Sequence, residues 1–514
     1  MVEKFLPTGE KVHAYPITSS QKMMYLMSLK YGSGYPVNNI GYGFYWKGEL
    51  DKAVMKQAIK EAIERCDTMR LRFIMGKKLQ LLQYVYYKSE LEVEDWDYSN
   101  MTIDEAEEKI LAFSRESIPM FNCELHRIAL VDFADGYHGI FMRIQHLAMD
   151  AYSLKVFVND IIDIYMHRTR GTAYPKPMRP YIPVLEDELA YETSQQHEDD
   201  KKYWYNSLAL TTEPIFTDFM LDNRLKQQQI KYPDRRFADI HSGLPDASGV
   251  KFSISAEDSK KIMELCEKNN LSVFSYLSMG IRTALSCFND NQEDVSFKMI
   301  INRRGTIAEK KSGGIRINFL PMRSIVKPTE SFIDAVRGIS DVQNEMYQHS
   351  RLAFLETLAE RHKSMSKEAK FDSTYDSFGL SYQPMMKMKA IDDEMEKTAR
   401  TIWYNNGAIM IPLYVTVVHR QSDGGFDFIC EYRTEQQAEY DLKVLCSKIE
   451  KAMVLGAENP EIKVQEVLDK IALTDEERNG KPQCKHSKNL LTSLQTTWKL
   501  TKSRLKTISS LISA

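Results

Sequence analysis

The chain has 514 residues, of which 43% are hydrophobic and 11% aromatic, so it can bury a large core in several domains or in one fold of two lobes. Its 68 basic and 71 acidic residues leave a formal net charge of −3, which gives no indication of a nucleic-acid partner or a strongly charged substrate. Seven scattered cysteines, an odd number without any CxxC spacing, indicate reduced thiols and argue against a disulfide framework or a zinc site.

Neither the first residues nor the most apolar run points to a secretory route or a membrane. The opening residues, MVEKFLPTGEKVHAYP, lack the apolar stretch of a signal peptide. The most apolar run, residues 408–418, contains Pro412 and covers about 11 residues, where a membrane span needs roughly 20. We therefore expect a cytoplasmic protein and interpret this run as a buried strand.

The N-terminal part alternates short strands with amphipathic helices, and we predict a first lobe over residues 12–175. Residues 51–66 have the apolar spacing of a core-facing helix. Residues 125–145 are typical of a hairpin that turns at Asp135–Gly136. A short loop follows, and LKVFVNDIIDIY (154–165) then predicts a second buried helix.

Beyond the first lobe the pattern weakens and then resumes. Residues 176–245 are richer in Pro, Asp and Gln, and we interpret them as a connecting region. A second helix and strand series predicts a C-terminal lobe over residues 246–478, with a buried helix over 271–288 and a hairpin turn at Asp423–Gly425.

The C-terminal tail, residues 479–514, differs from the rest because it contains seven Lys or Arg residues and no Asp or Glu. Its apolar residues follow a heptad-like spacing: Leu491, Leu494, Trp498, Leu505, Ile508 and Ile512. A basic amphipathic helix can lie on an anionic membrane or dock on a partner, and it can equally pack on its own protein or fray. Both interpretations stay open at this point.

Two segments contain His-x-x-x-Asp. His419 and Asp423 fall in the predicted hairpin, where Asp423 begins a turn, so a structural role is favoured. His146 and Asp150 follow a buried strand and precede a helix, which is where a scaffold presents an imidazole rigidly. A neutral imidazole can take a proton from an attacking amine, hydroxyl or thiol. The alternatives are a buried structural histidine at 146 and a helix N-cap at Ser153.

The segment around His146, QHLAMDAYS (145–153), resembles the HHxxxDGxS motif of the condensation domains of nonribosomal peptide synthetases, within the chloramphenicol-acetyltransferase-like superfamily. The second His, the Asp and the Ser match, whereas Gln145 and Ala151 replace the first His and the Gly. Four further segments resemble the family's motifs in the family's order: 18–25 (TSSQKMMY), 65–73 (RCDTMRLRF), 302–303 with 314–323 (NR and GIRINFLPMR), and 473–478 (LTDEER).

The resemblance implies an α/β fold of two chloramphenicol-acetyltransferase-like lobes in a V-shaped pseudo-dimer with a central tunnel. It implies that phosphopantetheine arms of two carrier proteins enter this tunnel and that the acceptor amine attacks the donor thioester. His146 would then orient or deprotonate the nucleophile. Asp150 would pair with an arginine, for which Arg303 is the predicted partner, although Arg303 could also be a surface charge.

The resemblance also predicts which residues line the tunnel. We expect five residues to line it or lie beside it: Gln145, Ala151, Ser153, Arg316 and Asn318. Gln145 cannot act as a base, and the methyl group of Ala151 would narrow the acceptor side or shift the loop. Arg316 stands where a Phe is usual and would bring a charge to the wall. Asn318 has the alternative role of a strand-end cap.

Three functions remain open from the sequence. The first is a free-standing condensation enzyme that meets acyl or peptidyl carrier proteins in trans, since neither an adenylation core nor a carrier-protein segment is found in the chain. The second is an acyltransferase that uses acyl-CoA or an acyl carrier to make esters or amides on a small molecule or lipid. The third is an inactive interaction module. No metal, no tightly bound cofactor and no nucleic acid is expected, and the tail is a predicted docking element for a carrier protein or a membrane.

Overall fold

The computed structural model describes residues 1–480, apart from Pro7, Ser33, 78–79, 209–212, 241–242, Ser366, Phe371, 386–392, Gln421 and Gln437. It divides the chain into two compact units. The first unit consists of Met1–His197, Asn302–Ile317 and Met386–Ala408, and the second of Glu198–Ile301, Asn318–Met385 and the chain from Ile409 onward.

The first unit is built on a five-stranded sheet of order β15-β3-β8-β7-β6. Its strands are β3 (Asn39–Trp46), β6 (Glu94–Tyr98), β7 (His126–Phe133), β8 (His138–Gln145) and β15 (Arg400–Tyr404). All neighbours pair antiparallel except β6 and β7. The predicted hairpin at 125–145 is therefore β7 and β8, and Gly136 supplies the positive φ, 79°, that its turn requires.

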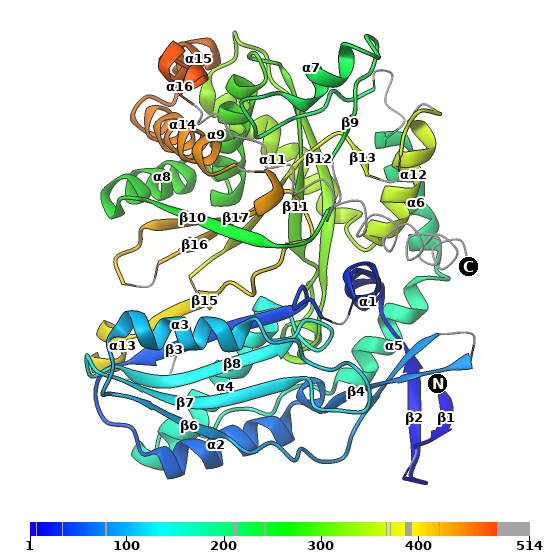
Figure 1. The fold of residues 1–514 in the computed structure, drawn as a ribbon, viewed down its shortest axis with the longest axis vertical. Coiled ribbons are helices and arrows are strands. Elements are labelled where there is room, and N and C mark those ends of the chain that lie inside the picture. Colours follow the sequence, from blue (N-terminus) through cyan, green and yellow to red (C-terminus); the bar gives the residue numbers. More distant parts are fainter. Residues whose placement is uncertain are drawn as a thin grey trace, which may run out of the picture. The chain divides into compact units, whose positions relative to one another are not determined.

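Helices cover both faces of this sheet (Figure 1). Helix α3 (Ile103–Ser114) packs on one face through Ala106 and Ile110, which contact Tyr45, Phe141 and other sheet residues. Helices α2 (Lys52–Arg65) and α4 (Ala151–Arg170) pack against each other on the opposite face. Because both faces are covered, all eight residues of β8 are buried.

The first unit also contains a four-stranded sheet of order β1-β2-β5-β4. Its strands are β1 (Val2–Phe5), β2 (Lys11–Pro16), β4 (Leu71–Met75) and β5 (Leu81–Val85). Further helices in the described part of this unit are α1 (Ser19–Tyr31), η1 (Asp67–Arg70), α5 (Tyr181–Tyr191), α10 (Ile307–Lys311) and α13 (Asp393–Thr398).

The second unit is built on a six-stranded sheet of order β10-β17-β16-β14-β11-β12. Its strands are β10 (Ala247–Ile254), β11 (Asp294–Asn302), β12 (Ile317–Ile325), β14 (Phe378–Gln383), β16 (Leu413–His419) and β17 (Phe426–Arg433). Its main helices are α8 (Ala256–Lys268), α9 (Val273–Phe288), α11 (Phe332–Gln348), α14 (Glu439–Glu458) and α15 (Val464–Ile471). Helix α9 is the predicted buried helix, and most of its residues are fully enclosed by the hydrophobic core.

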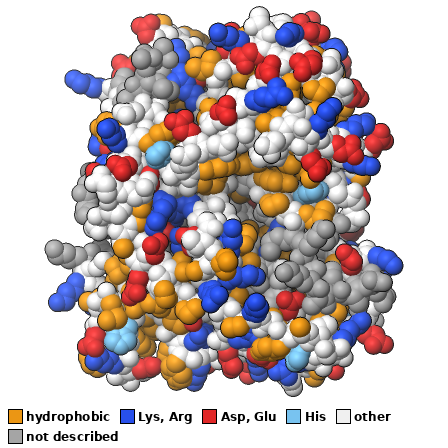
Figure 2. All heavy atoms as spheres, turned by 180° about the vertical axis from the view of Figure 1, so that it is seen from behind, with side chains coloured by type: hydrophobic (Ala, Val, Ile, Leu, Met, Phe, Trp, Pro, Cys, Tyr) orange, Lys and Arg blue, Asp and Glu red, His pale blue; other side chains and the backbone are white. Residues whose placement is uncertain are grey.

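The chain also forms smaller elements. They are α6 (Gln195–Leu208), α7 (Arg224–Gln229), β9 (Ala238–Asp239), α12 (Phe354–Ser364), β13 (Ser373–Thr374), η3 (Thr434–Gln436) and α16 (Asp475–Asn479). Among the described residues no single helix is long and apolar enough to cross a membrane, although α8 and α9, bent by 118°, pass that test as a pair by length and composition only. Acidic and basic side chains are interspersed over the face in Figure 2, as the nearly balanced charge leads one to expect.

The structure divides the chain at points other than those predicted. Residues 302–317 and strand β15 were placed in the C-terminal lobe, yet they belong to the first unit, where β15 extends the sheet by pairing with β3. Residues 176–245, predicted to be a connector, contribute α5 to the first unit and core residues such as Trp204 to the second. Local periodicity identifies a strand or a helix but does not show which distant segments it packs against. This explains both differences. The basic tail lies outside the described residues from 481 onward.

Candidate active site

The loop between β8 and α4 carries His146 and is held by backbone hydrogen bonds on both sides. The His146 N–H donates to the carbonyl of Asn38 at 2.6 Å. The side-chain oxygen of Gln145 accepts from the N–H of Leu147 at 3.1 Å, and the carbonyl of Leu147 accepts from the amide of Gln21 at 3.1 Å. Two separate segments of the first unit, together with the Gln145 side chain, therefore fix the backbone on either side of the histidine.

Gln21 is the residue that connects helix α1 to this loop. Its side-chain amide is completely buried. Gln21 and Gln83 exchange two hydrogen bonds of 2.8 Å, and the Gln21 oxygen also accepts from the Thr18 N–H. Together with the bond to Leu147, these contacts use every hydrogen-bonding position of the amide. Thr18 and Gln21 form the capping box of α1, so the helix start fixes the position of the amide. The segment 18–25, noted only as a motif resemblance, thus has a physical role at the His146 loop.

Asp150 ends the loop and begins helix α4. Its carboxylate accepts from the N–H of Ser153 at 3.0 Å and from that of Arg316 at 2.8 Å, and it pairs with the Arg304 guanidinium at 2.8 Å. Burial alone would raise the pKa of Asp150, but the charge and hydrogen bonds of Arg304 and these N–H groups hold the pKa below its usual value. Asp150 is therefore an ionised structural residue at neutral pH.

The N-cap of α4 is Asp150, so the prediction that Ser153 caps this helix is wrong. The Ser153 hydroxyl instead donates to the carbonyl of Gly314 at 2.7 Å and accepts from Arg304 at 2.6 Å. Gly314 adopts a positive φ of 83°, and a Cβ there would lie 2.9 Å from the ring of Tyr181. This glycine brings its carbonyl to the start of α4.

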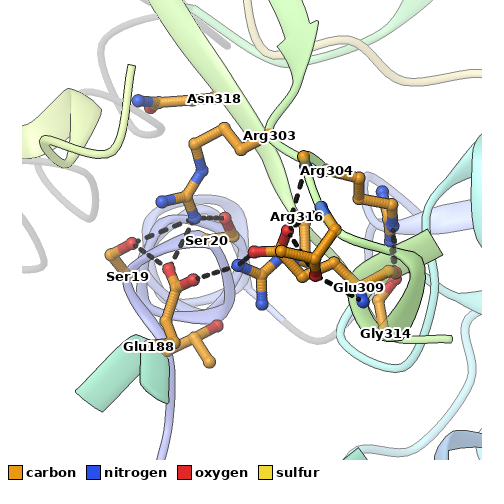
Figure 3. Close-up of polar contacts among 12 residues, drawn as sticks. Ser19, Ser20, Glu188, Arg303, Arg304, Glu309, Gly314, Arg316 and Asn318 are labelled. Atoms are coloured by element: carbon orange, nitrogen blue, oxygen red, sulfur yellow. Dashed lines mark hydrogen bonds and ion pairs between the residues drawn. The ribbon is translucent and has the colours of Figure 1, made fainter. Parts of the chain in front are cut away.

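The arginine that pairs with Asp150 is Arg304, so the prediction of Arg303 is wrong. Arg303 instead donates to Glu188 at 2.7 Å and to the Ser20 hydroxyl at 2.8 Å. Figure 3 shows the two guanidinium groups extending in opposite directions, that of Arg303 toward Ser20 and Glu188 and that of Arg304 toward Gly314. In extended chain after β11, successive side chains point to opposite sides, so an error of one residue exchanges the partners.

The His146 ring is half-buried, and its Nδ1 is enclosed without a hydrogen-bond partner among the described residues. Burial lowers the pKa of His146 below its ordinary value, while the Asp150 carboxylate and nearby backbone groups oppose that shift. The imidazole is consequently neutral at physiological pH. The imidazole lies on a loop held by hydrogen bonds at both flanks, as a general base requires.

A profile of the condensation-domain family matches residues 11–478 of this chain. The chain belongs to the condensation-domain family. The match covers both units and includes the His146 loop, so the resemblance noted in the five sequence segments is confirmed.

The most similar relatives include large peptide synthases of Bacillus subtilis (strain 168). One plipastatin synthase chain of this organism is 23% identical over 442 residues, which are 85% of this chain and 16% of that protein. Surfactin synthase subunit 1 of the same organism is 22% identical over 479 residues, 91% of this chain and 12% of that protein. The condensation domain described here thus spans a small fraction of the relatives it matches.

Solved condensation domains have the same fold. The first condensation domain of the calcium-dependent antibiotic synthetase, in complex with a substrate analogue, gives a TM-score of 0.72 at 18% identity and covers 88% of this chain and 99% of its own. The starter condensation domain of rhizomide synthetase, a mutant in complex with C8-CoA, gives 0.70 at 16% identity and covers 88% and 96%. The predicted α/β, chloramphenicol-acetyltransferase-like fold is confirmed.

Arg316, which departs from the family's usual Phe, lies between two carboxylates of the first unit. It pairs with Glu188 at 3.0 Å and with Glu309 at 2.6 Å, and its side chain is almost completely buried. Burial lowers the pKa of Arg316, and the two carboxylates counteract this. The charge introduced by this substitution is therefore matched within the same unit, and its predicted place at a tunnel wall stays a prediction.

The other two departures leave the loop geometry unstrained. Ala151 is the first residue of α4 and is not among the described residues with positive φ, so its backbone does not require a glycine. Gln145 is buried at the end of β8, where its side chain bonds to Leu147 as described above. Whether these side chains line a tunnel stays a prediction.

Asn318 is committed to contacts inside the second unit. Its amide donates to the carbonyls of Ser350 at 2.9 Å and Leu352 at 2.7 Å, and its oxygen accepts from the N–H groups of Phe319 and Phe354. These bonds connect the start of β12 to the segment before α12, a structural role close to the alternative of a capping residue. Its place at a tunnel wall also stays a prediction.

Several site residues were missed by the sequence analysis. Arg304 was overlooked beside the motif arginine, and Asn38 and Glu188 carry no local signal because their roles depend on contacts across more than 100 residues. Within the described part of the chain, no three His, Cys, Asp or Glu side chains lie together in a way that could hold a metal ion.

Proposed function

We propose that this condensation domain transfers an acyl group from a carrier-protein thioester to an amine and forms an amide, with His146 as the base. Condensation domains are acyltransferases that form amide bonds in general. The observation that carries the proposal for this chain is the neutral imidazole of His146 on a loop whose two flanks are fixed by Asn38, Gln21 and Arg304.

The reaction requires one bond to form and one to break. The amine nitrogen attacks the thioester carbonyl, the new C–N bond forms through a tetrahedral intermediate, and the C–S bond then breaks to release the thiol. The attacking amine must lose a proton, which the His146 lone pair can accept and later return to the departing sulfur. A base with a pKa below its ordinary value is free of its own proton at pH 7, so it is ready at the start of each cycle.

Asp150 supports this role without touching the reacting atoms. It caps α4 and binds Arg304 and the Arg316 N–H, so the loop that carries His146 is closed by contacts with residues 302–317. Positioning of this kind reduces the freedom of the base before the substrate arrives.

The relatives support a particular class of donor and partner. The curated relatives are large peptide synthases, and one similar solved domain is described in complex with C8-CoA. These findings support a donor on a phosphopantetheine-type thiol, either a carrier protein meeting this domain in trans or CoA. Phosphopantetheine is then part of the substrate.

The test is turnover with acyl-loaded carrier proteins from the protein's own gene neighbourhood and with acyl-CoA, with products identified by mass spectrometry. We expect His146→Ala to reduce turnover by about 10²–10⁴-fold without changing thermal unfolding. His419→Ala is the matched control, because His419 also precedes an aspartate by four residues but lies at the end of β16 beside a hairpin turn, and it should leave turnover unchanged. Unchanged turnover in a folded His146→Ala protein would refute the proposed role.

A further inference from the structure

Lys155 is a half-buried lysine on α4 that has no anionic partner among the described residues. It lies one helical turn beyond Ala151, and residues four apart share a helix face, so it is on the face that begins beside the His146 loop. No ion pair or hydrogen bond of its ammonium is found within the described residues. Burial lowers the pKa of Lys155 to about 8, and no carboxylate of the described residues opposes this shift.

Two other buried lysines, Lys298 and Lys448, are paired with carboxylates. Lys298 binds the Asp376 carboxylate, and Lys448 binds Glu477 at 2.8 Å. Taking a charge out of water without a partner is costly, and for this reason buried lysines are nearly always paired. The ammonium of Lys155, which has no ion pair among the described residues, is therefore available to bind an anion.

Trp403 supplies a second unused donor beside it. The Lys155 Nζ lies 5.9 Å from the centre of the Trp403 ring, and the indole Nε1 is buried without a hydrogen-bond partner among the described residues. Tyr42 packs edge-on against the indole at 4.8 Å and holds it on the adjacent strand. A buried indole N–H normally has an acceptor, and here the ammonium lies near an indole ring whose N–H has none among the described residues.

From these contacts we propose that Lys155 and Trp403 form a subsite for the carboxylate of the amine acceptor. A carboxylate has two oxygens, so it can accept from the ammonium and from the indole N–H together. The proposal rests on the proposed function and narrows it. An acceptor bound to a carrier protein as a thioester has no free α-carboxylate, whereas a soluble amino acid has one. The acceptor class is therefore a free amino acid or a similar amino carboxylate.

The test compares amino acids with their carboxamides as acceptors, with octanoyl-CoA and an octanoyl-loaded carrier protein as donors. We expect the wild-type protein to prefer the acids. Lys155→Met, which keeps the length of the side chain, should lower kcat/KM for the acids by about 10–100-fold, mainly through KM, and leave the amides nearly unchanged. Trp403→Phe, which keeps a ring but removes the N–H, should act in the same direction and more weakly. Lys60→Met on the exposed face of α2 is the matched control and should have no effect.

Binding is measured separately from turnover, by calorimetry with the same acids and amides. Binding that is selective for acids and lost in Lys155→Met, without product, would support the subsite and refute acyl transfer. Product formation without preference for acids would refute the subsite and support acyl transfer. An equal loss for acids and amides in Lys155→Met, or no binding of any acid, would overturn the subsite. If Lys155→Met impairs only phosphopantetheine thioesters and not their dephosphorylated forms, the anion bound by Lys155 is a phosphate. This result would also overturn the carboxylate subsite.

Discussion

Replacing Arg304 with methionine removes the positive half of the Asp150–Arg304 ion pair. Both side chains are about 1% exposed, so the remaining carboxylate has no route to solvent. Breaking a buried pair by removing one partner costs about 3–5 kcal/mol, because the other charge is left uncompensated. We therefore expect Arg304→Met to reduce the free energy of unfolding of the first unit by about that amount at pH 7.

Arg303→Met is the comparison that separates the two neighbouring arginines. Glu188, the partner of Arg303, keeps its second ion pair with Arg316 at 3.0 Å when Arg303 is lost. The carboxylate is then not left unpaired, and we expect a smaller loss of about 1–3 kcal/mol. Both arginines are buried, so the difference between the variants reflects the second partner of Glu188 and the additional bonds of Arg304 to Ser153 and the Gly314 carbonyl.

The pH dependence of this loss has a defined sign. The pKa of Asp150 is lower in the folded protein than the value of about 3.9 in an unfolded chain. Its contribution to stability is therefore fully present above pH 4 and disappears as the pH falls through the folded value. The stability difference between wild type and Arg304→Met should be largest near neutral pH and should shrink in acid.

The measurement is urea unfolding at pH 7 and below pH 4, combined with hydrogen–deuterium exchange of peptides covering 138–170, which report on β8 and α4. A double-mutant cycle with Asp150→Asn isolates the pair, because asparagine can still cap the helix. We expect a coupling energy of about 1–3 kcal/mol between positions 150 and 304. A loss below about 1 kcal/mol for Arg304→Met, or a larger coupling of Asp150 to Arg303, would show that the reasoning is wrong.

Three further predictions concern the loop and its neighbours. The acid limb of the kcat/KM profile should lie below pH 6.5, because burial lowers the pKa of His146. Asp150→Asn should move this limb to still lower pH, because the Asp150 charge raises the pKa of His146. An acid limb above pH 6.5 would contradict the prediction. Gln21→Ala leaves the Leu147 carbonyl without its side-chain donor and should cost about 1–3 kcal/mol in urea unfolding and lower turnover as the loop loosens, and unchanged turnover would exclude a positioning role. Arg316→Phe restores the residue usual in the family but removes a partner from two carboxylates, so it should destabilise the protein, and a gain in melting temperature would contradict the ion pairs described.

The sequence was sufficient for the family, the fold class and the place of His146. These rest on short-range signals, namely the strand at 138–145, the turn around Asp150 and the apolar spacing of the following helix, all of which the structure contains. The segment 18–25 was recognised as a motif, although its reason was not. Only the structure shows that Gln21 reaches across 126 residues to the carbonyl of Leu147.

What the sequence could not supply is which side chains meet. Arg303 and Arg304 are adjacent, and nothing in their neighbourhood states which one points to Asp150, because that depends on the register of the extended chain after β11. Strand β15 is separated from its partner β3 by more than 350 residues, so no local pattern could place it in the first unit. Burial and partner choice at such positions are set by tertiary packing.

The departures from the family motif bear on whether the domain can still be active. A lone Phe-to-Arg change at position 316 would bury an uncompensated charge beside the Asp150 loop. In this chain one oxygen of Glu309 binds Arg316 while the other accepts from the Thr306 N–H at the start of α10, and Glu188 binds Arg316 from the other side. The substitution thus occurs together with the groups that neutralise it. A site whose introduced charge is ion-paired can keep the geometry on which acyl transfer depends, and this favours an active enzyme over an inactive module of the same fold.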